Sequence, residues 1–186
     1  MDMGWNIVKL NKSEYKGTIL PISYKTNEIY GVIKEIGESN NLVLRLFKKK
    51  LDSPFEHDAA KEGFPDRLYQ DHFENALAFG VIEGNSLLAA IEVNEEKWSN
   101  RLRVTELWVK EGKRRQGIGK SLMDKAKAMA KENGNRAIIL ETQTSNVEAI
   151  AFYLSQGFVF DGVDLTCYGN DDVSRGEVRL ELVYLF

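Results

Sequence analysis

Two arginines and two glycines lie close together in the second half of the chain, after the apolar run "ELWV". The loop that holds them consists of Arg114, Arg115, Gln116, Gly117, Ile118 and Gly119. It opens a predicted amphipathic helix, whose first N–H groups have no partner within the helix, and glycine lets an anion approach them closely. Arginine side chains add charge that suits a pyrophosphate. The loop is therefore either a phosphate-binding site or a solvated basic turn whose glycines serve close packing.

Two other nucleotide-binding motifs are excluded by spacing. The run "GIGKS" resembles the end of a P-loop, but the first glycine of that motif would fall at Arg114. The dinucleotide fingerprint would need its third glycine at Leu122. The loop therefore fits neither motif.

The loop and a second motif together resemble a known family. Arg-x-x-Gly-x-Gly after "ELWV" resembles motif A of the GNAT N-acetyltransferases, which binds the pyrophosphate of acetyl-CoA. The segment "SNVEAIAFYLSQGF", Ser145 to Phe158, looks like the family's Asn-x-x-Ala-x-x-Phe-Tyr-x-x-x-Gly-Phe motif. The two occur in the family's order, and the resemblance covers about Asn75 to the C-terminus. Within the family, the residues from Leu140 to Tyr168 look most like streptothricin acetyltransferases, which acylate an amine on the β-lysine part of a cationic antibiotic.

The resemblance implies a fold and a co-substrate. The expected fold class is α/β (α+β), a GNAT-like mixed, largely antiparallel twisted sheet with a central parallel strand pair flanked by helices. Acetyl-CoA is the implied co-substrate, and no metal is expected. The residues expected to bind it are Leu107, Val109, Arg114, Arg115, Gln116, Gly117, Ile118, Gly119, Lys120 and Asn146. The N–H groups near Leu107 and Val109 would polarise the acetyl carbonyl if a bulge there opened the strand pairing.

Acetyl transfer to an amine requires a base, because an alkylammonium with a pKa near 10.4 must lose a proton at neutral pH. Glu141 ends the apolar run "AIIL" at the carboxyl end of a predicted parallel strand, where ligands gather. Some GNAT enzymes have a glutamate base at the matching position, so we expect Glu141 to be the base. The alternatives are a solvated edge carboxylate and an ion pair with an arginine.

Tyr153 is the candidate acid. A phenol with a pKa near 10 stays protonated at neutral pH and can give its proton to a departing thiolate. In a helix, Asn146 lies nearly two turns before Tyr153, on the same side. The residues alone favour a core aromatic beside Phe152 and Phe158, and it is the resemblance that implies the acid role.

Further carboxylates are candidates for the acceptor amine. Strand alternation places Glu106 with Leu102, Val104 and Trp108, and a carboxylate on an apolar face needs a partner. Glu92 repeats this pattern on another strand. The two would form a negative pocket for a cationic amine, or else internal salt bridges. Asp161 and Asp164 either line the substrate's path or belong to exposed loops.

These residues depend on a series of predicted elements in the second half. A hairpin turning at Glu83–Asn85 precedes the strand "NRLRVTELWV" and the helix that ends near Gly134. The buried strand "RAIILET" follows, and Ser145 to Glu148 fits a capping box at the start of the next helix. The strands "FVFDGV" and "EVRLELVYLF" complete the order. Alternation of strand and helix predicts parallel pairing at the centre.

The first half is less regular. "NIVKL", "NEIYGVIKEI" and "NNLVLRLF" are predicted strands, although "YGVIKEI" is also compatible with a helix. The polar stretch from Lys48 to Asn75 is predicted as a loop followed by a short helix. No linker divides the chain, so one domain over 1–186 is expected, with a variable part at 1–74 and a motif-bearing core at 75–186.

Composition limits the partners and the compartment. The chain has 25 basic and 28 acidic residues, a net charge of −3, which argues against nonspecific nucleic-acid binding. The one cysteine, Cys167, excludes an intrachain disulfide and a multi-cysteine zinc site, and it fits a reducing compartment. His57 and His72 have no third ligand at suitable spacing, so no metal site is predicted. No signal-peptide or membrane-spanning run is found, so a cytoplasmic protein without a membrane partner is expected.

The sequence therefore predicts an acetyl-CoA-dependent N-acetyltransferase that acts on a small cationic amine of the streptothricin type and confers resistance. A GNAT enzyme for a polyamine, a protein N-terminus or a lysine side chain is the alternative. A non-catalytic acyl-CoA sensor is a third reading, against which the presence of Tyr153 and Glu141 argues. The oligomeric state stays open, and a homodimer is compatible with the sequence.

Overall fold

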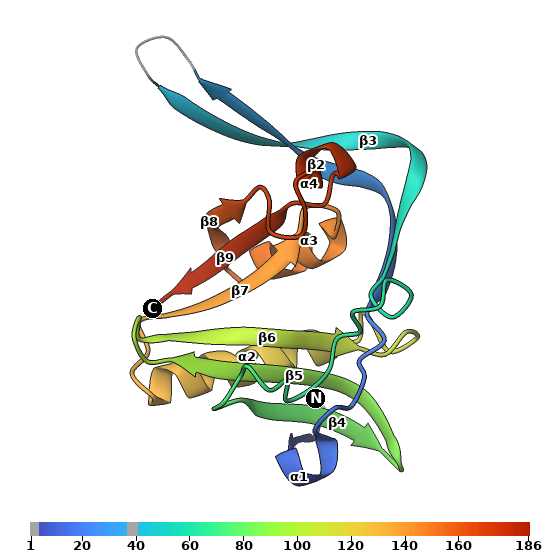
Figure 1. Cartoon of the computed structure of the whole chain (residues 1–186). Coiled ribbons are helices and arrows are strands. Elements are labelled where there is room, and N and C mark those ends of the chain that lie inside the picture. Colours follow the sequence, from blue (N-terminus) through green and yellow to red (C-terminus); the bar gives the residue numbers. More distant parts are fainter. Residues whose placement is uncertain (1–3, 37–40) are drawn as a thin grey trace. The chain divides into compact units, whose positions relative to one another are not determined.

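The computed structural model describes residues 4–36 and 41–186, and its elements are labelled in Figure 1. In chain order these are β1 (Ile7–Leu10), α1 (Lys12–Tyr15), β2 (Ser23–Ile36), β3 (Leu42–Asp58), β4 (Leu77–Glu83), β5 (Ser86–Glu96), β6 (Arg101–Val109), α2 (Ile118–Glu132), β7 (Ala137–Gln143), α3 (Val147–Ser155), β8 (Val159–Asp164), α4 (Asp172–Arg175) and β9 (Arg179–Leu185).

Seven strands form one sheet in the order β1-β4-β5-β6-β7-β9-β8, and β2 pairs with β3 in a second sheet. The pairs β1–β4, β4–β5 and β5–β6 are antiparallel, whereas β6 and β7 are parallel. The expected mixed sheet with a central parallel pair is therefore confirmed. The chain forms two compact units, which are described separately below. The first holds the described residues of Met1–Ile22, Asp58–Leu140 and Val183–Phe186, and the second holds those of Ser23–His57 and Glu141–Leu182.

The helix α2 has the predicted apolar face. Its buried residues are Ile118, Leu122, Met123, Ala126 and Ala130. Gly134 follows with a φ of +69°, a left-handed conformation that glycine adopts without strain and that commonly ends helices. Met129 is half-buried. The helix prediction is confirmed.

A β-bulge interrupts the β5–β6 pairing. Glu92 pairs with Glu106, but the next residue, Val93, pairs with Val104, so Thr105 is the extra residue of β6. Residues directly opposite each other share a face, and Glu92 and Val93 point to opposite faces. Val104 and Glu106 therefore lie on opposite faces of the sheet. The prediction that strict alternation puts Glu106 with Leu102 and Val104 is wrong, because the inserted residue reverses the alternation.

The face that carries Glu106 has its own core. Trp108 and Ala90 pack there with Leu10, Leu68 and Tyr69. The covering residues come from the end of β1 and from the segment before β4. This packing places backbone N–H groups and side chains of residues 68–76 against the sheet face that carries Glu92 and Glu106.

The loop and short helix predicted for the polar stretch from Lys48 to Asn75 are wrong, whereas the strand predicted for "NEIYGVIKEI" is confirmed. β3 continues through the polar run to Asp58, including Pro54, and no helix is found between Ala59 and Ala76. Proline is compatible with an edge strand, because the N–H it lacks is not needed on the open side. The segment "YGVIKEI" is a strand, part of β2. The breaks expected at Gly37 and Asn40 lie outside the described residues.

In the second unit, α3 begins one residue later than the predicted capping box. Asn146 is the N-cap, and its side-chain oxygen accepts a hydrogen bond from the N–H of Ala149 at 3.2 Å. Ser145 is instead fully buried, and its Oγ lies 2.7 Å from the hydroxyl of Tyr24 on β2. The capping box is therefore wrong, while the helix itself and its end before Gly157 are confirmed. Among the described residues, no helix has the length and apolar character needed to cross a bilayer.

Candidate active site

The glycine loop lies where β6 leads into α2, within the first unit. Gly117 is the N-cap of α2 with a φ of +83°, and no side chain caps this helix. A Cβ built on Gly117 would meet no atom within 4 Å, so the space over this residue is open. The first N–H groups of a 15-residue helix therefore face an accessible space, an arrangement that binds anions. Arg115 also has a positive φ of 63°, which is uncommon outside glycine.

The other side chains of this region either make polar contacts nearby or, for Ile118, are buried. Arg114 donates from Nε to the carbonyl of Val109 at 3.4 Å, and Gln116 donates from Nε2 to the carbonyl of Gly112 at 3.1 Å. These bonds fold the loop on itself. Ile118 is buried, so only its main chain is available to a ligand. Lys120 forms an ion pair with Asp124 at 2.6 Å, one turn further along the helix.

The N–H groups of Leu107 and Val109 face away from β5. The N–H of Lys110 donates to the carbonyl of Leu88 at 2.8 Å, and in antiparallel pairs every second residue makes such bonds. By this alternation Trp108 and Glu106 also bond to β5, while Leu107 and Val109 point to the other edge of β6. The pairing with β7 ends at Val104↔Leu140. The bulge of β6 lies at Thr105 and not at Leu107 or Val109, where the role of these two residues would have called for one.

Glu92 on β5 and Glu106 on β6 are paired directly opposite each other on adjacent strands. Glu92 is fully buried and accepts hydrogen bonds from the N–H of Tyr69 at 2.5 Å and from the hydroxyl of Thr105 at 2.9 Å. Glu106 is 7% exposed, and Nε2 of Gln70 donates to its Oε1 at 3.2 Å. For Glu92 the hydrogen bonds replace the predicted internal salt bridge.

The environment of Glu92 favours its neutral form. Burial raises the pKa of the Glu92 carboxyl above its ordinary value, and the hydrogen bonds from Tyr69 and Thr105 offset part of that rise. Tyr69 is itself held firmly. Its hydroxyl donates a hydrogen bond to the carbonyl of Leu10 and accepts one from the N–H of Ala78 at 3.1 Å. Its backbone has a positive φ of 60°. Sequence reasoning missed Tyr69 and Gln70, because their partners are more than twenty residues away along the chain.

In the second unit, Glu141 forms an ion pair. One nitrogen of Arg179 on β9, Nη2, lies 2.7 Å from Glu141 and 2.9 Å from Glu181. The Glu141 side chain is 42% exposed, so it is accessible while paired. Of the alternatives considered for Glu141, the arginine pair is therefore present. Arg179 was not singled out from the sequence, since no local pattern links it to Glu141.

Tyr168 is a phenol near Glu141. Partial burial, followed by the Glu141 carboxylate and the neighbouring Cys167, raises the pKa of the Tyr168 hydroxyl above its ordinary value. A phenol in this setting keeps its proton at neutral pH. Its main-chain N–H donates to the buried Asp172 carboxylate at 2.8 Å, which fixes the segment that carries it.

Tyr153 lies on α3 and is buried. Its ring is 5.5 Å from that of Phe152 and 6.1 Å from that of Phe158, measured between centroids. It thus has the aromatic packing that the residues alone favoured. Asn146, at the start of the same helix, uses its side-chain oxygen as the helix cap, which leaves its amide nitrogen for another acceptor.

The remaining candidate residues have neighbours of their own. Asp161 and Asp164 are exposed on β8, and Asp164 accepts from the N–H of Thr166 at 3.1 Å. His57 is buried, stacks on Tyr24 at 4.9 Å between ring centroids, and lies 3.2 Å from a carboxylate oxygen of Glu177. The His72 ring contacts that of Phe73 in a tilted arrangement, with 4.1 Å between the ring centroids.

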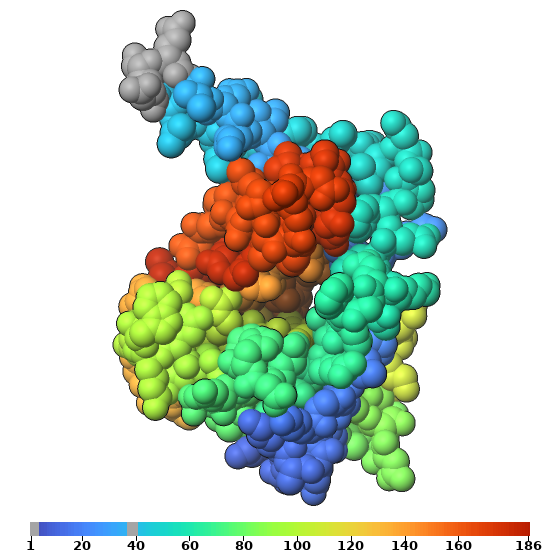
Figure 2. Space-filling model, viewed as in Figure 1, coloured from blue at the N-terminus to red at the C-terminus, as the bar shows by residue number. Residues whose placement is uncertain are grey.

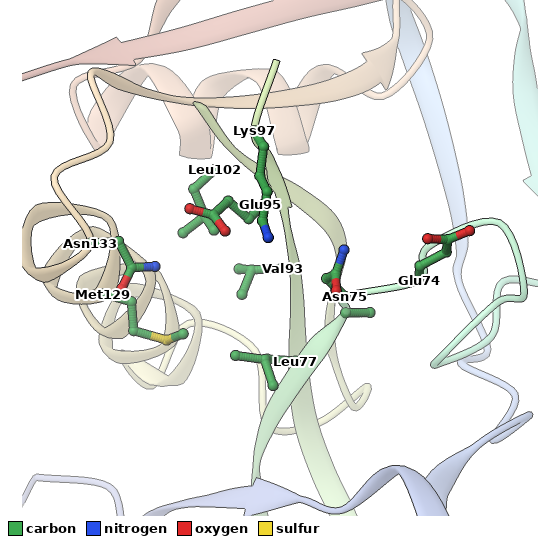
Figure 3. Close-up of a pocket in the computed structure, with 10 residues that line it drawn as sticks. Glu74, Asn75, Leu77, Val93, Glu95, Lys97, Leu102, Met129 and Asn133 are labelled. Carbon is green, nitrogen blue, oxygen red and sulfur yellow. The ribbon is translucent and has the colours of Figure 1, made fainter. Parts of the chain in front are cut away.

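The first unit also has a pocket of about 420 Å³, shown in Figure 3. Leu77, Val93, Leu102 and Met129 form its apolar part, and polar side chains such as Glu95 and Asn133 surround them. None of its lining residues was a predicted site residue. It therefore is not part of the candidate active site.

Comparison with known proteins decides the family. The profile of the acetyltransferase (GNAT) family matches residues 42–158, which include the glycine loop and the second motif. The chain belongs to the GNAT acetyltransferase family. The predicted family is thereby confirmed.

Among its GNAT relatives are streptothricin acetyltransferases, as the motifs indicated. Streptothricin acetyltransferase A of Bacillus subtilis (strain 168) is 31% identical over 113 residues, 61% of this chain and 64% of that protein. The streptothricin acetyltransferase of Streptomyces lavendulae is 36% identical over 126 residues, 68% of this chain and 66% of that protein. The matches thus span slightly less than two thirds of these relatives.

Two solved structures share the fold of this GNAT protein over nearly its whole length. Nourseothricin acetyltransferase superposes with a TM-score of 0.74 at 22% identity, covering 98% of this chain and 99% of that one. A protein of Bacillus anthracis strain Ames, assigned as a streptothricin acetyltransferase and solved with acetyl coenzyme A, gives 0.73 at 23% identity, covering 100% and 99%.

Proposed function

We propose that this chain is an acetyl-CoA-dependent N-acetyltransferase that acetylates a primary amine of a small cationic molecule, with the β-lysine part of streptothricin as the acceptor. The observation that carries the proposal is the uncapped N-terminus of α2 behind Gly117, in a chain of the GNAT family. The choice of acceptor is supported by the streptothricin acetyltransferases among its relatives. Antibiotic resistance in a cytoplasmic setting would follow from this activity.

The glycine loop fits the phosphates of CoA. Acetyl-CoA would supply the acetyl group as a thioester, whose transfer leaves a thiolate. The open space over Gly117 and the N–H groups of the first turn of α2 suit a pyrophosphate, and Arg114, Arg115 and Lys120 add positive charge nearby. The main chains of Gln116, Ile118 and Gly119 would complete this site. The amide nitrogen of Asn146 would bind the amide-rich arm of CoA.

Leu107 and Val109 would stabilise the developing negative charge. Their N–H groups point to the edge of β6 that is not used by β5, beyond the last residue paired with β7. Donors fixed in a strand need no reorganisation when charge develops on an acetyl oxygen. Two such N–H groups would therefore form the oxyanion-stabilising part of the site.

Glu141 would accept the proton of the incoming ammonium group. The exposed part of its carboxylate is accessible, and Arg179 holds it in place from β9. Because the same nitrogen of Arg179 also contacts Glu181, Arg179 has a second carboxylate to bind when a cationic amine reaches Glu141. Glu141 can therefore give up its ion pair with Arg179 and bind the ammonium group of the substrate instead.

Tyr153 would supply the proton for the departing thiolate from its hydroxyl oxygen Oη. Its ring is held by Phe152 and Phe158, which reduces the motion of the hydroxyl group. A phenol with an ordinary pKa near 10 is protonated at neutral pH, as the role requires.

Glu92 and Glu106 would attract the cationic acceptor. Glu106 is the more accessible of the two, and Gln70 orients it. Glu92 lies directly opposite Glu106 on the neighbouring strand, β5. Asp161 and Asp164 on β8 would add negative charge along the substrate's path.

The test is thiol release from acetyl-CoA with streptothricin, spermidine, an aminoglycoside and N-terminal peptides as acceptors. We expect the highest kcat/KM with streptothricin. Preference for spermidine or a peptide would replace the acceptor and keep the acetyltransferase. If no amine gave turnover while acetyl-CoA still bound, the chain would be an acyl-CoA sensor and the proposal would be wrong.

A further inference from the structure

The hairpin formed by β2 and β3 exposes many large apolar side chains. Its strands have 14 and 17 residues, and they pair only with each other. Ile36 is 75% exposed and Leu42 81% exposed. The full set of exposed large apolar side chains on the hairpin is Ile33, Ile36, Leu42, Val43, Leu44 and Phe47. On the face shown in the space-filling view, the light-blue and cyan residues of the hairpin are uncovered (Figure 2).

These side chains lie on both faces of the hairpin. Phe47 covers Gly31, whose Cβ would come within 2.8 Å of the Phe47 ring, so these two residues share a face. Lys48 lies over the ring of Tyr30 at 5.9 Å, which defines the opposite face. By alternation, Val43 shares the face of Phe47, and Leu44 shares the face of Lys48. Strands that are apolar on both faces are typical of sheets that are covered on both faces.

A two-stranded hairpin with this surface is incomplete by itself. Isolated two-stranded ribbons are marginally stable in water, and contiguous exposed apolar surface marks an interaction site. Unlike the seven-stranded sheet, the outer half of this hairpin has no buried residue between Leu42 and Lys50. A partner that covers it would remove this apolar surface from water.

The charge of the hairpin indicates which partner fits. Residues 30–50 contain five basic and two acidic residues, a net charge of +3, whereas the whole chain carries −3. The rest of the chain therefore carries −6. A second copy of the chain therefore offers net negative charge outside its own hairpin. A polyanion such as a nucleic acid or an acidic lipid surface would bind the hairpin but be repelled by the remainder.

We propose that this hairpin is the self-association surface of the chain, and that each copy lays its hairpin on the part of a second copy outside that copy's hairpin, where the net charge is negative. A twofold arrangement makes this contact twice, so both hairpins are covered in one closed dimer. Basic side chains such as Lys48 and Lys49 then face carboxylates of the partner, and the apolar side chains between them are buried. The proposal goes beyond the acetyl transfer and does not depend on it.

Sedimentation velocity of the full chain tests the proposal. At about 100 µM protein and low salt we expect a dimer, which raised salt weakens because ion pairs between surfaces are screened. The Leu42→Asp/Leu44→Asp double variant should weaken the dimer at least tenfold, and Lys48→Glu/Lys49→Glu should weaken it as well. Trp98→Asp, at a residue that is 84% exposed outside the hairpin, is the matched control and should leave the dimer intact.

Far-UV circular dichroism checks that each variant is folded. A wild-type protein that is monomeric at about 100 µM would overturn the proposal. So would a dimer that tolerates both hairpin variants. A monomer that sediments with vesicles containing phosphatidylserine, or with RNA, would assign the hairpin to that partner instead.

Discussion

Glu92 on β5 and Glu106 on β6 lie directly opposite each other on adjacent strands. Two consecutive residues hold them: the N–H of Tyr69 donates to Glu92, and the side-chain amide of Gln70 donates to Glu106. Burial raises the pKa of the Glu92 carboxyl, and the hydrogen bonds from Tyr69 and Thr105 offset part of that rise. The segment before β4 thus holds a pair of carboxylates in place, one buried and one more accessible. Two predictions concern this pair.

Glu92→Gln should change how stability depends on pH. Because the pKa of Glu92 is raised from its ordinary value of 4.5 in the folded chain, the folded state retains this proton while the unfolded chain releases it. The contribution is fully present below 4.5 and is lost as pH rises through the raised pKa. The variant should therefore gain free energy of unfolding relative to wild type between about pH 4 and about pH 7, measured by urea unfolding. Glu111→Gln, at an exposed loop position, is the control, and a pH-independent difference for Glu92→Gln would contradict the assignment.

Glu106→Gln should weaken binding of the acceptor amine. A neutral side chain no longer attracts the cation, so KM for the amine should rise several-fold, about three- to tenfold, with a smaller effect on kcat. Acetyl-CoA affinity should stay the same. Gln70→Ala, which removes the orienting hydrogen bond but keeps the charge, should raise KM less. Unchanged KM in steady-state assays of Glu106→Gln would remove this residue from the acceptor site.

Gly117→Asp should reduce acetyl-CoA affinity by more than about tenfold, because the new carboxylate would occupy the open space over the helix start and repel phosphates. The substitution also strains a residue with a φ of +83°. Gly17→Asp is the matched control, since Gly17 has a φ of +80° and equally open surroundings. Calorimetry that finds equal affinities in both variants would show that the loop does not bind the cofactor.

Tyr153→Phe should lower kcat about a hundredfold, near 2.7 kcal/mol, since it removes the proton and keeps the ring packing. Acetyl-CoA binding should change little. Tyr168→Phe removes the phenol near Glu141 and should have the smaller effect on kcat. Rapid-quench kinetics must first show that the chemical step limits kcat. If kcat then fell more in Tyr168→Phe than in Tyr153→Phe, Tyr168 would be the acid.

Glu141→Gln should lower kcat/KM for the amine and move the rise of its pH profile to higher pH, because the base is lost. Arg179→Gln, which removes the ion pair at 2.7 Å and leaves the carboxylate, should alter KM for the cationic amine more than the pH profile. The profiles are compared at saturating acetyl-CoA. Superimposable profiles for wild type and Glu141→Gln would mean that a bound water or another carboxylate, such as Glu92, is the base.

The sequence by itself determined the elements whose signals are local. The apolar spacing from Ile118 to Ala130 specifies α2, because residues one turn apart share a helix face, and Gly117 and Gly134 mark its two ends. The strands β4 to β7 and the parallel β6–β7 pair follow from the same kind of pattern. The sequence alone therefore locates the glycine loop and the segment Ser145 to Phe158, and assigns them to the correct elements.

Only the tertiary structure decided the features that depend on distant partners. The bulge at Thr105, which moves Glu106 to the face opposite Val104, arises from how β6 pairs with β5, and alternation along one strand cannot reveal it. The same holds for Gln70 beside Glu106 and for Arg179 beside Glu141, which come from segments more than thirty residues apart. The polar run before Asp58 is a strand because β2 supplies its hydrogen bonds, and that stabilisation outweighs the weak preferences of its own residues.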